Sequence, residues 1–263
     1  MAAIDRAGPS THQEVHRTMA NVQTRQIDYH GGGADMTGYM AWDADADGPR
    51  PGILVVHEWW GRNDYACRRA RDLAEAGYAA IAVDMYGGAT TAANPQEAGA
   101  LMTSITDDMA MGRARFEAAL AAFSGQPEVD AGRTGAIGFC FGGGAVLHMA
   151  RVGVPLDVVA SFHGALKLAV CEGVDAVSAR VVVYNGQADS FVPPEEIAAY
   201  LETMDGAGTD HQFIQLPGAL HGFSNPIATT NGEKYGLPLA YNPHADQASW
   251  SHMLLTFEDV FGD

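Results

Sequence analysis

One short stretch of the sequence carries the residue types of a hydrolase nucleophile, with a cysteine in the reactive place. Gly138-Phe139-Cys140-Phe141-Gly142 has the spacing of G-x-S-x-G, in which a serine lies on a sharp turn between a strand and a helix. Glycines leave room for such a turn, and the positive end of the following helix favours a thiolate and stabilises an oxyanion. The same residues also fit a buried cysteine that acts as a small apolar side chain.

An acidic residue and a histidine follow at the ends of later predicted strands. Asp189 comes after the apolar run 181–184, and His221 comes after the next predicted strand. The order nucleophile, acid, histidine is that of the α/β-hydrolases, in which the histidine takes the nucleophile's proton and the acid orients the imidazole. Each residue has a structural alternative, because Asp189 fits a turn or a helix cap and His221 is one of ten histidines. Their order and their strand-end positions favour a Cys-His-Asp triad.

The elements that must position these residues alternate between strands and helices. Short apolar runs rich in β-branched residues, such as 52–56, indicate strands that are buried on both faces. The alternation predicts an α/β fold with a mainly parallel central sheet and helices on both faces, and ligands of such sheets bind beyond the carboxyl ends of the strands. The predicted strands are 22–29 and 36–42, as an antiparallel pair, then 52–56, 78–83, 134–138, 156–161, 179–184 and 211–216; the predicted helices are 64–76, 95–123 with at least one break, 142–151, 194–204 and 244–261.

Composition and charge exclude several classes of function. A chain of 263 residues with 47% hydrophobic and 18% charged residues is typical of a globular protein. Its formal net charge of -17 repels phosphate backbones and acidic lipid surfaces, so neither nucleic acid nor a membrane is expected as a partner. The sequence contains neither a P-loop nor a cluster with metal-ligand spacing, so no cofactor and no metal is expected.

Cysteine content and the chain ends predict one domain in a reducing compartment. Three cysteines are too few for a disulfide framework in a chain of this length. The sequence begins without a signal-peptide pattern and has no apolar run long enough to span a bilayer, so a cytoplasmic location is expected. Residues 1–20 are polar and aperiodic and are expected to form a flexible arm, with a single domain over residues 21–263.

The assembled motifs resemble those of the dienelactone hydrolase family, the cysteine-nucleophile branch of the α/β-hydrolase fold. The resemblance runs from about residue 22 to the end of the chain, and its most specific parts are the cysteine in the turn and a His-Glu pair after an early strand. It implies a three-layer αβα sandwich and hydrolysis of a carboxylic ester or lactone. Its main carriers are His57-Glu58-Trp59-Trp60-Gly61, Asp84-Met85-Tyr86-Gly87, Gly138-Phe139-Cys140-Phe141-Gly142-Gly143 and His221-Gly222-Phe223.

The resemblance also implies roles for individual side chains. Cys140 would be the nucleophile, His221 its base, and Asp189 the acid that orients the imidazole. Glu58 would modulate the thiol, which rests neutral until substrate displaces the carboxylate and is thereby protected from oxidation. Without the resemblance, Glu58 fits an ion pair in a loop.

The walls of the site follow from the same resemblance. The backbone N–H groups of Trp59 and Phe141 would form the oxyanion hole. Trp60, Tyr86 and Phe223 would line the substrate pocket together with Trp59, although each aromatic residue also fits an ordinary core position. Two further histidines at strand ends, His57 and His163, are expected to be structural.

The sequence departs from the dienelactone-cleaving members at two arginines that hold the substrate carboxylate. Residues 87–90 read Gly-Gly-Ala-Thr where one arginine is expected, and Asn225 stands where the other is expected, four residues after His221. Loss of a guanidinium removes a strong and geometrically specific contact to a carboxylate. Together with the acidic net charge, this loss predicts a small neutral ester or lactone as the substrate. The long segment 224–245 is expected to form a loop over the site that sets specificity.

Other functions stay open at this point. One is a true dienelactone hydrolase, or carboxymethylenebutenolidase, that works without the two arginines. Amidotransferase-like and chaperone-like proteins also carry a cysteine on such a turn, but they usually lack the Asp-then-His order. A redox-sensing or interaction protein would use Cys140 as a reactive thiol without hydrolysis. The chain itself is expected to be a monomer or a weak homo-oligomer.

Overall fold

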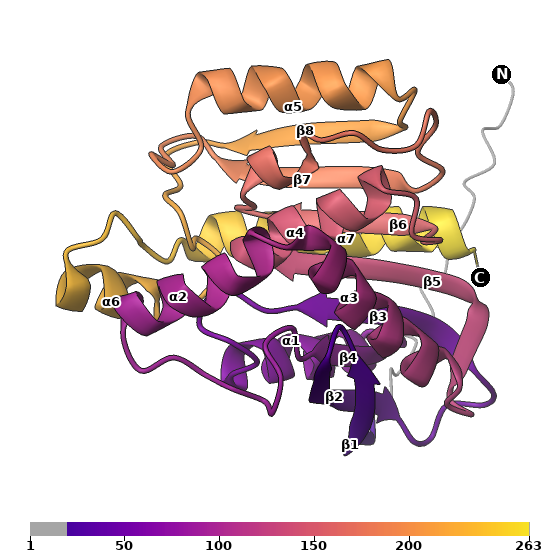
Figure 1. Cartoon of the computed structure of the whole chain (residues 1–263). Coiled ribbons are helices and arrows are strands. Elements are labelled where there is room, and N and C mark those ends of the chain that lie inside the picture. Colours follow the sequence, from indigo (N-terminus) through magenta and orange to yellow (C-terminus); the bar gives the residue numbers. More distant parts are fainter. Residues whose placement is uncertain (1–19, 263) are drawn as a thin grey trace, which may run out of the picture.

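The computed structural model describes residues 20–262, and within them an eight-stranded sheet forms the centre of the molecule (Figure 1). The arm expected over residues 1–20 lies almost entirely outside the described residues. The strand order is β1-β2-β4-β3-β5-β6-β7-β8, with β1 and β2 antiparallel to their neighbours and the other strands mutually parallel. The strands are β1 Val22–Gly31, β2 Ala34–Asp43, β3 Arg50–Val56, β4 Ala79–Val83, β5 Val129–Phe139, β6 Val158–Phe162, β7 Arg180–Gly186 and β8 His211–Leu216.

Helices cover both faces of this sheet. Side chains that alternate along β3 divide between the two layers, because Ile53 and Val55 join the core under α1 and α7, whereas Leu54 and Val56 join the core under α3, α4 and α5. The helices are α1 Asp64–Glu75, α2 Pro95–Thr106, α3 Met109–Ser124, α4 Phe141–Arg151, the 3₁₀ helix η1 Leu166–Ala169, α5 Pro194–Gly206, α6 Ala228–Tyr235 and α7 Pro243–Phe261. The predicted α/β fold, with a mainly parallel sheet between helical layers, is confirmed. None of the helices within residues 20–262 combines the length and apolarity needed to cross a bilayer.

The structure locates one expected break and differs from the expectations at two other places. The helical region 95–123 breaks where Asp108 caps α3 by accepting a hydrogen bond from the Met111 N–H at 3.0 Å, which gives the expected break a definite position. Strand β5 begins at Val129, five residues before the predicted start, because Val129 and Asp130 pair with Arg50 and Pro51 ahead of a register shift. The segment 224–245, expected to be a loop, contains helix α6, which ends at Gly236 in the left-handed conformation.

The carboxyl ends of the parallel strands gather the polar residues that the sequence singled out. Glu58 follows β3, Cys140 follows β5, Asp189 follows β7 and His221 follows β8. Helices α2 and α6 lie at this same end of the sheet, on the left in Figure 1, where the Tyr235 hydroxyl at the end of α6 donates to the carbonyl of Ala93 just before α2. The candidate catalytic residues therefore follow strands of the sheet, whereas α2 and α6 beside them belong to the segments that connect one element of the fold to the next.

Candidate active site

Cys140 lies on a tight turn between β5 and α4 with a strained backbone. Its φ is 55° and its ψ is -117°, a conformation that residues with a side chain rarely adopt. The turn is possible because its neighbours lack a Cβ. A Cβ on Gly138 would lie 2.0 Å from the carbonyl oxygen of Gly142, and one on Gly142 would lie 2.3 Å from that of Val56. The glycines around Cys140 are thus required by the geometry of this strand-to-helix turn, which is the geometry that a nucleophile turn would need.

The Asp189 carboxylate holds the ring of His221 in a single tautomer. Asp189 Oδ2 lies 2.8 Å from His221 Nδ1, and Asp189 Oδ1 accepts a hydrogen bond from the Phe191 N–H at 2.9 Å. Because a carboxylate can only accept, Nδ1 carries a proton and Nε2 is left for a second partner. Burial alone would lower the pKa of His221, but the neighbouring Cys140 thiol and Asp189 carboxylate raise it above its usual value. The three residues that the sequence proposed as a triad lie together.

Glu58 is a buried carboxyl group whose partner is an uncharged amide. The residue is 6% exposed, and its Oε2 accepts a hydrogen bond from Asn225 Nδ2 at 2.7 Å. Burial raises the pKa of Glu58 to about 7, although the Asn225 hydrogen bond and the nearby His221 act in the opposite direction. Asn225 replaces one of the arginines of the expected carboxylate clamp, and its contact with Glu58 is a role that the sequence did not reveal.

An apolar cavity of about 230 Å³ opens at Cys140 and His221. Trp59 and Phe141 also line it, so the two residues whose N–H groups were expected to form the oxyanion hole are in the right region. Among the described residues that line the cavity, Lys167 is the only lysine or arginine and Glu196 the only aspartate or glutamate. The complete lining is Trp59, Met102, Thr106, Cys140, Phe141, Ala165, Lys167, Leu168, Phe191, Val192, Glu196, His221, Leu237 and Leu239.

The expected pocket residues Trp60, Tyr86 and Phe223 do not line this cavity. All three are buried, with exposed fractions of 8%, 9% and 0%. The Tyr86 hydroxyl donates to the carbonyl of Trp59 at 3.1 Å, so Tyr86 supports the wall from behind. Trp60 packs between Trp59 and Tyr235, and Phe223 packs against His163. The walls come instead from α2, η1, the start of α5 and residues 237–239. Most of their lining side chains are apolar, and their positions in the sequence carry no motif.

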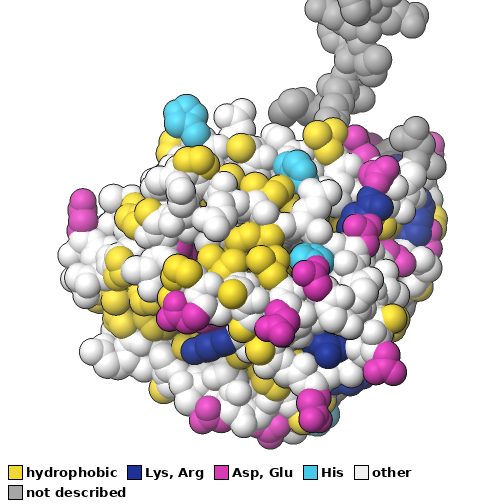
Figure 2. All heavy atoms as spheres, turned by 90° about the horizontal axis from the view of Figure 1, so that it is seen from above, with side chains coloured by type: hydrophobic (Ala, Val, Ile, Leu, Met, Phe, Trp, Pro, Cys, Tyr) yellow, Lys and Arg dark blue, Asp and Glu magenta, His cyan; other side chains and the backbone are white. Residues whose placement is uncertain are grey.

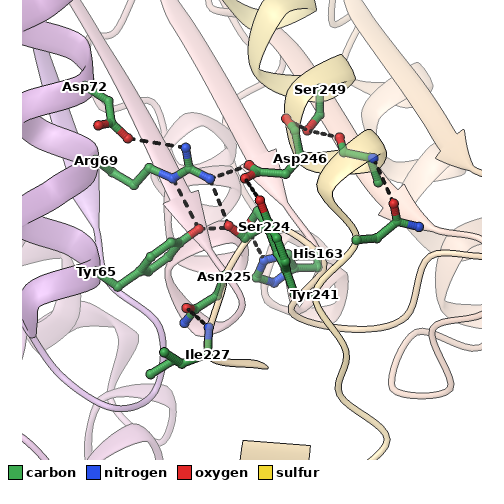
Figure 3. Close-up of polar contacts among 12 residues, drawn as sticks. Tyr65, Arg69, Asp72, His163, Ser224, Asn225, Ile227, Tyr241, Asp246 and Ser249 are labelled. Atoms are coloured by element: carbon green, nitrogen blue, oxygen red, sulfur yellow. Dashed lines mark hydrogen bonds and ion pairs between the residues drawn. The ribbon is translucent and has the colours of Figure 1, made fainter. Parts of the chain in front are cut away.

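Behind the cavity, a buried polar network connects the loop of His221 to α1 and α7 (Figure 3). The Ser224 carbonyl accepts a hydrogen bond from Arg69 Nη2 at 2.9 Å, and Arg69 forms an ion pair with Asp246. The Ser224 hydroxyl contacts both Tyr65 and His163 at 2.8 Å. Most residues of this network could not be predicted from the sequence, because the residues that they contact lie more than 60 positions away in the chain.

His57 has the structural role that the sequence predicted. Its Nδ1 donates to the Glu58 carbonyl at 2.6 Å, and its Nε2 accepts from the Met85 N–H at 3.3 Å. Burial lowers the pKa of His57 to about 4, so the ring is neutral near pH 7 and has no free nitrogen for chemistry. Within residues 20–262, no group of three or more His, Cys, Asp or Glu side chains is arranged to bind a metal ion.

Sequence comparisons relate this chain to a known protein family. A sequence model of the dienelactone hydrolase family matches residues 36–261. A protein of Aquifex aeolicus, provisionally named a carboxymethylenebutenolidase, is 27% identical over 208 residues, which cover 76% of this chain and 87% of the relative.

Solved structures of similar proteins share the fold of this chain. A dienelactone hydrolase-like promiscuous phosphotriesterase from metagenomic libraries is 35% identical, with a TM-score of 0.83 over 91% of this chain and 98% of the other. A dienelactone hydrolase from Anabaena variabilis, 21% identical, shares the fold, with a TM-score of 0.61 over 88% of this chain and 97% of the other.

Proposed function

The chain belongs to the dienelactone hydrolase family, and we propose that it hydrolyses small neutral esters or lactones through an acyl-enzyme on Cys140. The observation that carries this proposal is the pairing of His221 Nδ1 with Asp189 Oδ2 at 2.8 Å, beside a cavity that Cys140 and His221 both line. This pairing leaves His221 Nε2 free to take the thiol proton. The coarser conclusion, a carboxylic ester hydrolase, follows from the family itself.

The proposed reaction has two halves. Cys140 Sγ attacks the ester carbonyl while its proton passes to His221, and the tetrahedral intermediate collapses as His221 gives that proton to the departing alcohol. Water then loses a proton to His221 and attacks the thioester, and the acid product leaves with the thiol restored. The amide N–H groups of Trp59 and Phe141, residues that both line the cavity, would stabilise the oxyanion in each half.

Glu58 is proposed to control the thiol. A carboxyl group that titrates with a pKa of about 7 changes charge in the pH range where the enzyme would work. Its uncharged Asn225 partner does not hold it ionised, as an arginine would. The iodoacetamide alkylation rate of Cys140 should therefore show an inflection near about pH 7 that is absent in Glu58→Gln. An unchanged pH profile in the variant would remove Glu58 from the proposed mechanism.

The cavity walls support a neutral substrate. They carry one lysine and one glutamate, so they lack the pair of cations that would clamp a substrate carboxylate. We expect neutral lactones to be hydrolysed faster than matched lactones that carry a carboxylate. Faster turnover of the carboxylate-bearing lactones would instead support a true carboxymethylenebutenolidase.

The decisive experiment compares the wild-type protein with Cys140→Ala, Cys140→Ser and His221→Ala. Hydrolysis of p-nitrophenyl acetate and butyrate should fall by about 10³-fold or more in Cys140→Ala and in His221→Ala. Intact-protein mass spectrometry of the wild type should detect an acetyl adduct on Cys140. Equal nitrophenol release by the wild type and Cys140→Ala would refute the hydrolytic mechanism, and a Cys140 that is alkylated without any esterase activity would support the redox-thiol alternative.

A second activity, cleavage of neutral phosphotriesters, is favoured by the metagenomic relative that is named for it and is 35% identical over nearly its whole length. A thiolate that attacks an ester carbonyl can attack the phosphorus of a neutral triester in the same apolar cavity, with the aryl oxide as leaving group. Paraoxon should release nitrophenol and leave a diethylphosphoryl group on Cys140. Absence of both products with an active esterase would exclude this second activity.

A further inference from the structure

His163 connects the turn of the nucleophile to the loop of the catalytic histidine. The residue follows β6 and is fully buried. Its Nδ1 accepts a hydrogen bond from the Cys140 N–H at 3.1 Å, a donor that it shares with the Phe162 carbonyl at 3.0 Å. Its Nε2 lies 2.8 Å from the Ser224 hydroxyl (Figure 3).

These contacts fix the proton of the His163 ring. A backbone N–H can only donate, so Nδ1 must present its lone pair to Cys140 and Nε2 must carry the proton that goes to Ser224. Burial and the nearby His221 lower the pKa of His163 well below its ordinary value, so the ring remains neutral. A neutral imidazole with both nitrogens occupied can transmit position but cannot act as a second base.

Both ends of this connection belong to the catalytic machinery. Cys140 carries the thiol, and its N–H belongs to the strained peptide unit that aims Sγ. Ser224 lies three residues after His221 and directly before Asn225, the partner of Glu58. One imidazole is therefore bonded both to the turn that bears the nucleophile and to the loop that bears the base.

Ser224 is also hydrogen-bonded to two residues of α1. Its carbonyl accepts from Arg69, and its hydroxyl contacts Tyr65, so α1 fixes the loop from the opposite side. His163 itself has a φ of 41°, a left-handed conformation that costs energy for a residue with a side chain. Its N–H donates to the Tyr184 carbonyl at 2.8 Å, which holds that backbone in place.

We propose that His163 is a positioning residue that sets the separation of the Cys140 thiol and the His221 imidazole through its two hydrogen bonds. The proposal rests on the proposed roles of Cys140 and His221. Proton transfer between them occurs in both halves of the reaction, and its rate is sensitive to small displacements. Loss of His163 should therefore lower kcat while KM, which reports the walls of the cavity, changes little.

Three variants distinguish the effect of losing the two hydrogen bonds of His163 from the effect of losing the volume of its ring. His163→Phe keeps a ring and removes both bonds, His163→Asn keeps an acceptor near the position of Nδ1, and Ser224→Ala removes one partner. Active sites are counted by stoichiometric iodoacetamide labelling of Cys140, so that kcat refers to folded protein only.

We expect kcat per site to fall by about 10- to 100-fold in His163→Phe, with KM within about threefold of the wild type. His163→Asn should recover part of this loss. Ser224→Ala should lower kcat in the same direction, and His163→Phe/Ser224→Ala should be no worse than His163→Phe, because both substitutions break the same connection.

An unchanged kcat per site in His163→Phe, with only the labelled fraction or the melting temperature reduced, would overturn the proposal. If His163→Phe does not fold, an unchanged kcat in Ser224→Ala would overturn it equally. Cys140→Ala is assayed beside them. An inactive Cys140→Ala with a fully active His163→Phe refutes the positioning role alone, whereas an active Cys140→Ala refutes the proposed function itself.

Discussion

At the scale of single residues, two buried carboxyl groups close to His221, those of Asp189 and Glu58, have different hydrogen-bond partners. Asp189 accepts hydrogen bonds from the His221 ring and from a backbone N–H. Glu58 accepts a single hydrogen bond from the neutral Asn225. Cys140, Asp189 and His221 could be proposed from their order at strand ends, whereas the role of Glu58 was implied only by the family resemblance. The contact of Asn225 could not be predicted, because it depends on how its loop returns across the sheet.

The raised pKa of Glu58 makes the protein less stable as the pH rises. The unfolded carboxyl group loses its proton near its ordinary pKa of about 4.5, whereas the folded group keeps it up to about pH 7, so the native state binds more protons between these values. The free energy of unfolding should therefore fall through this window by an amount on the order of 3 kcal/mol. Urea denaturation of the wild type and Glu58→Gln at about pH 5 and about pH 8 measures the difference, which should be absent in the variant.

Glu202→Gln is the matched control for that experiment. Glu202 lies on the exposed side of α5, so its substitution should leave the wild-type dependence on pH in place. A Glu58→Gln protein that keeps the full wild-type slope between about pH 5 and about pH 8 would contradict the burial argument.

At the scale of elements, the sequence predicted what local pattern determines and missed what packing determines. The buried strands β3, β4 and β7 have continuous apolar runs, so their positions could be predicted closely. Helix α6 contains Thr-Thr-Asn-Gly, which are poor helix formers, and it is stabilised by burial of Ala228 and Gly232 and by the Tyr235 contact with Ala93. The cavity walls could not be predicted for the same reason, because Met102, Leu168 and Leu237 meet only in the folded chain.

The close packing between the nucleophile turn and β3 predicts a large effect of one added methyl group. In Gly142→Ala the new Cβ would lie 2.3 Å from the Val56 carbonyl oxygen and 2.5 Å from that of His57, so the turn must shift. We expect a stability loss of more than about 2 kcal/mol and a lower esterase kcat, measured by denaturation and by assay. Gly99→Ala on α2, where a Cβ meets nothing within 4 Å, should instead be neutral or stabilising by about 0.5–1 kcal/mol. Equal stability of the two variants would contradict this account.

The ion pair between Arg69 of α1 and Asp246 of α7 predicts a second contrast. Both side chains are buried, so Arg69→Met would leave the Asp246 charge without its partner, at an expected cost of about 3–5 kcal/mol. Arg180 also pairs with two carboxylates, but its side chain is 34% exposed, and Arg180→Met should cost less than about 1 kcal/mol. Chemical denaturation of both variants tests the contrast, and a smaller loss in Arg69→Met than in Arg180→Met would be inconsistent with it.

At the scale of the whole molecule, charge and apolar surface are distributed differently. On the face shown in Figure 2, acidic side chains are spread over the surface, whereas hydrophobic side chains gather near its middle. The formal net charge of -17 therefore acts as a general field on any approaching substrate. That field distinguishes neutral esters from anionic ones before they reach the cavity.

Ionic strength should reveal this field. Raising the salt concentration from about 20 mM to about 300 mM shortens the screening length, so kcat/KM for an anionic ester such as p-nitrophenyl hemisuccinate should rise by about two- to fivefold. The value for p-nitrophenyl acetate should remain constant, because the neutral ester does not respond to the field. Parallel changes for both esters would indicate a general salt effect on the enzyme.

The separate origins of the proposed catalytic groups and the cavity walls have a consequence for how this protein can diversify. Cys140, Asp189 and His221 follow strands of the sheet, whereas Met102, Leu168, Leu237 and Leu239 lie in its connecting helices and loops. Mutations in these connections can alter which acyl and alcohol groups fit without disturbing the sheet that orients the reactive atoms. A library restricted to the wall positions should therefore retain a high proportion of folded, chemically competent variants with divergent substrate ranges, which makes the scaffold a suitable starting point for directed evolution.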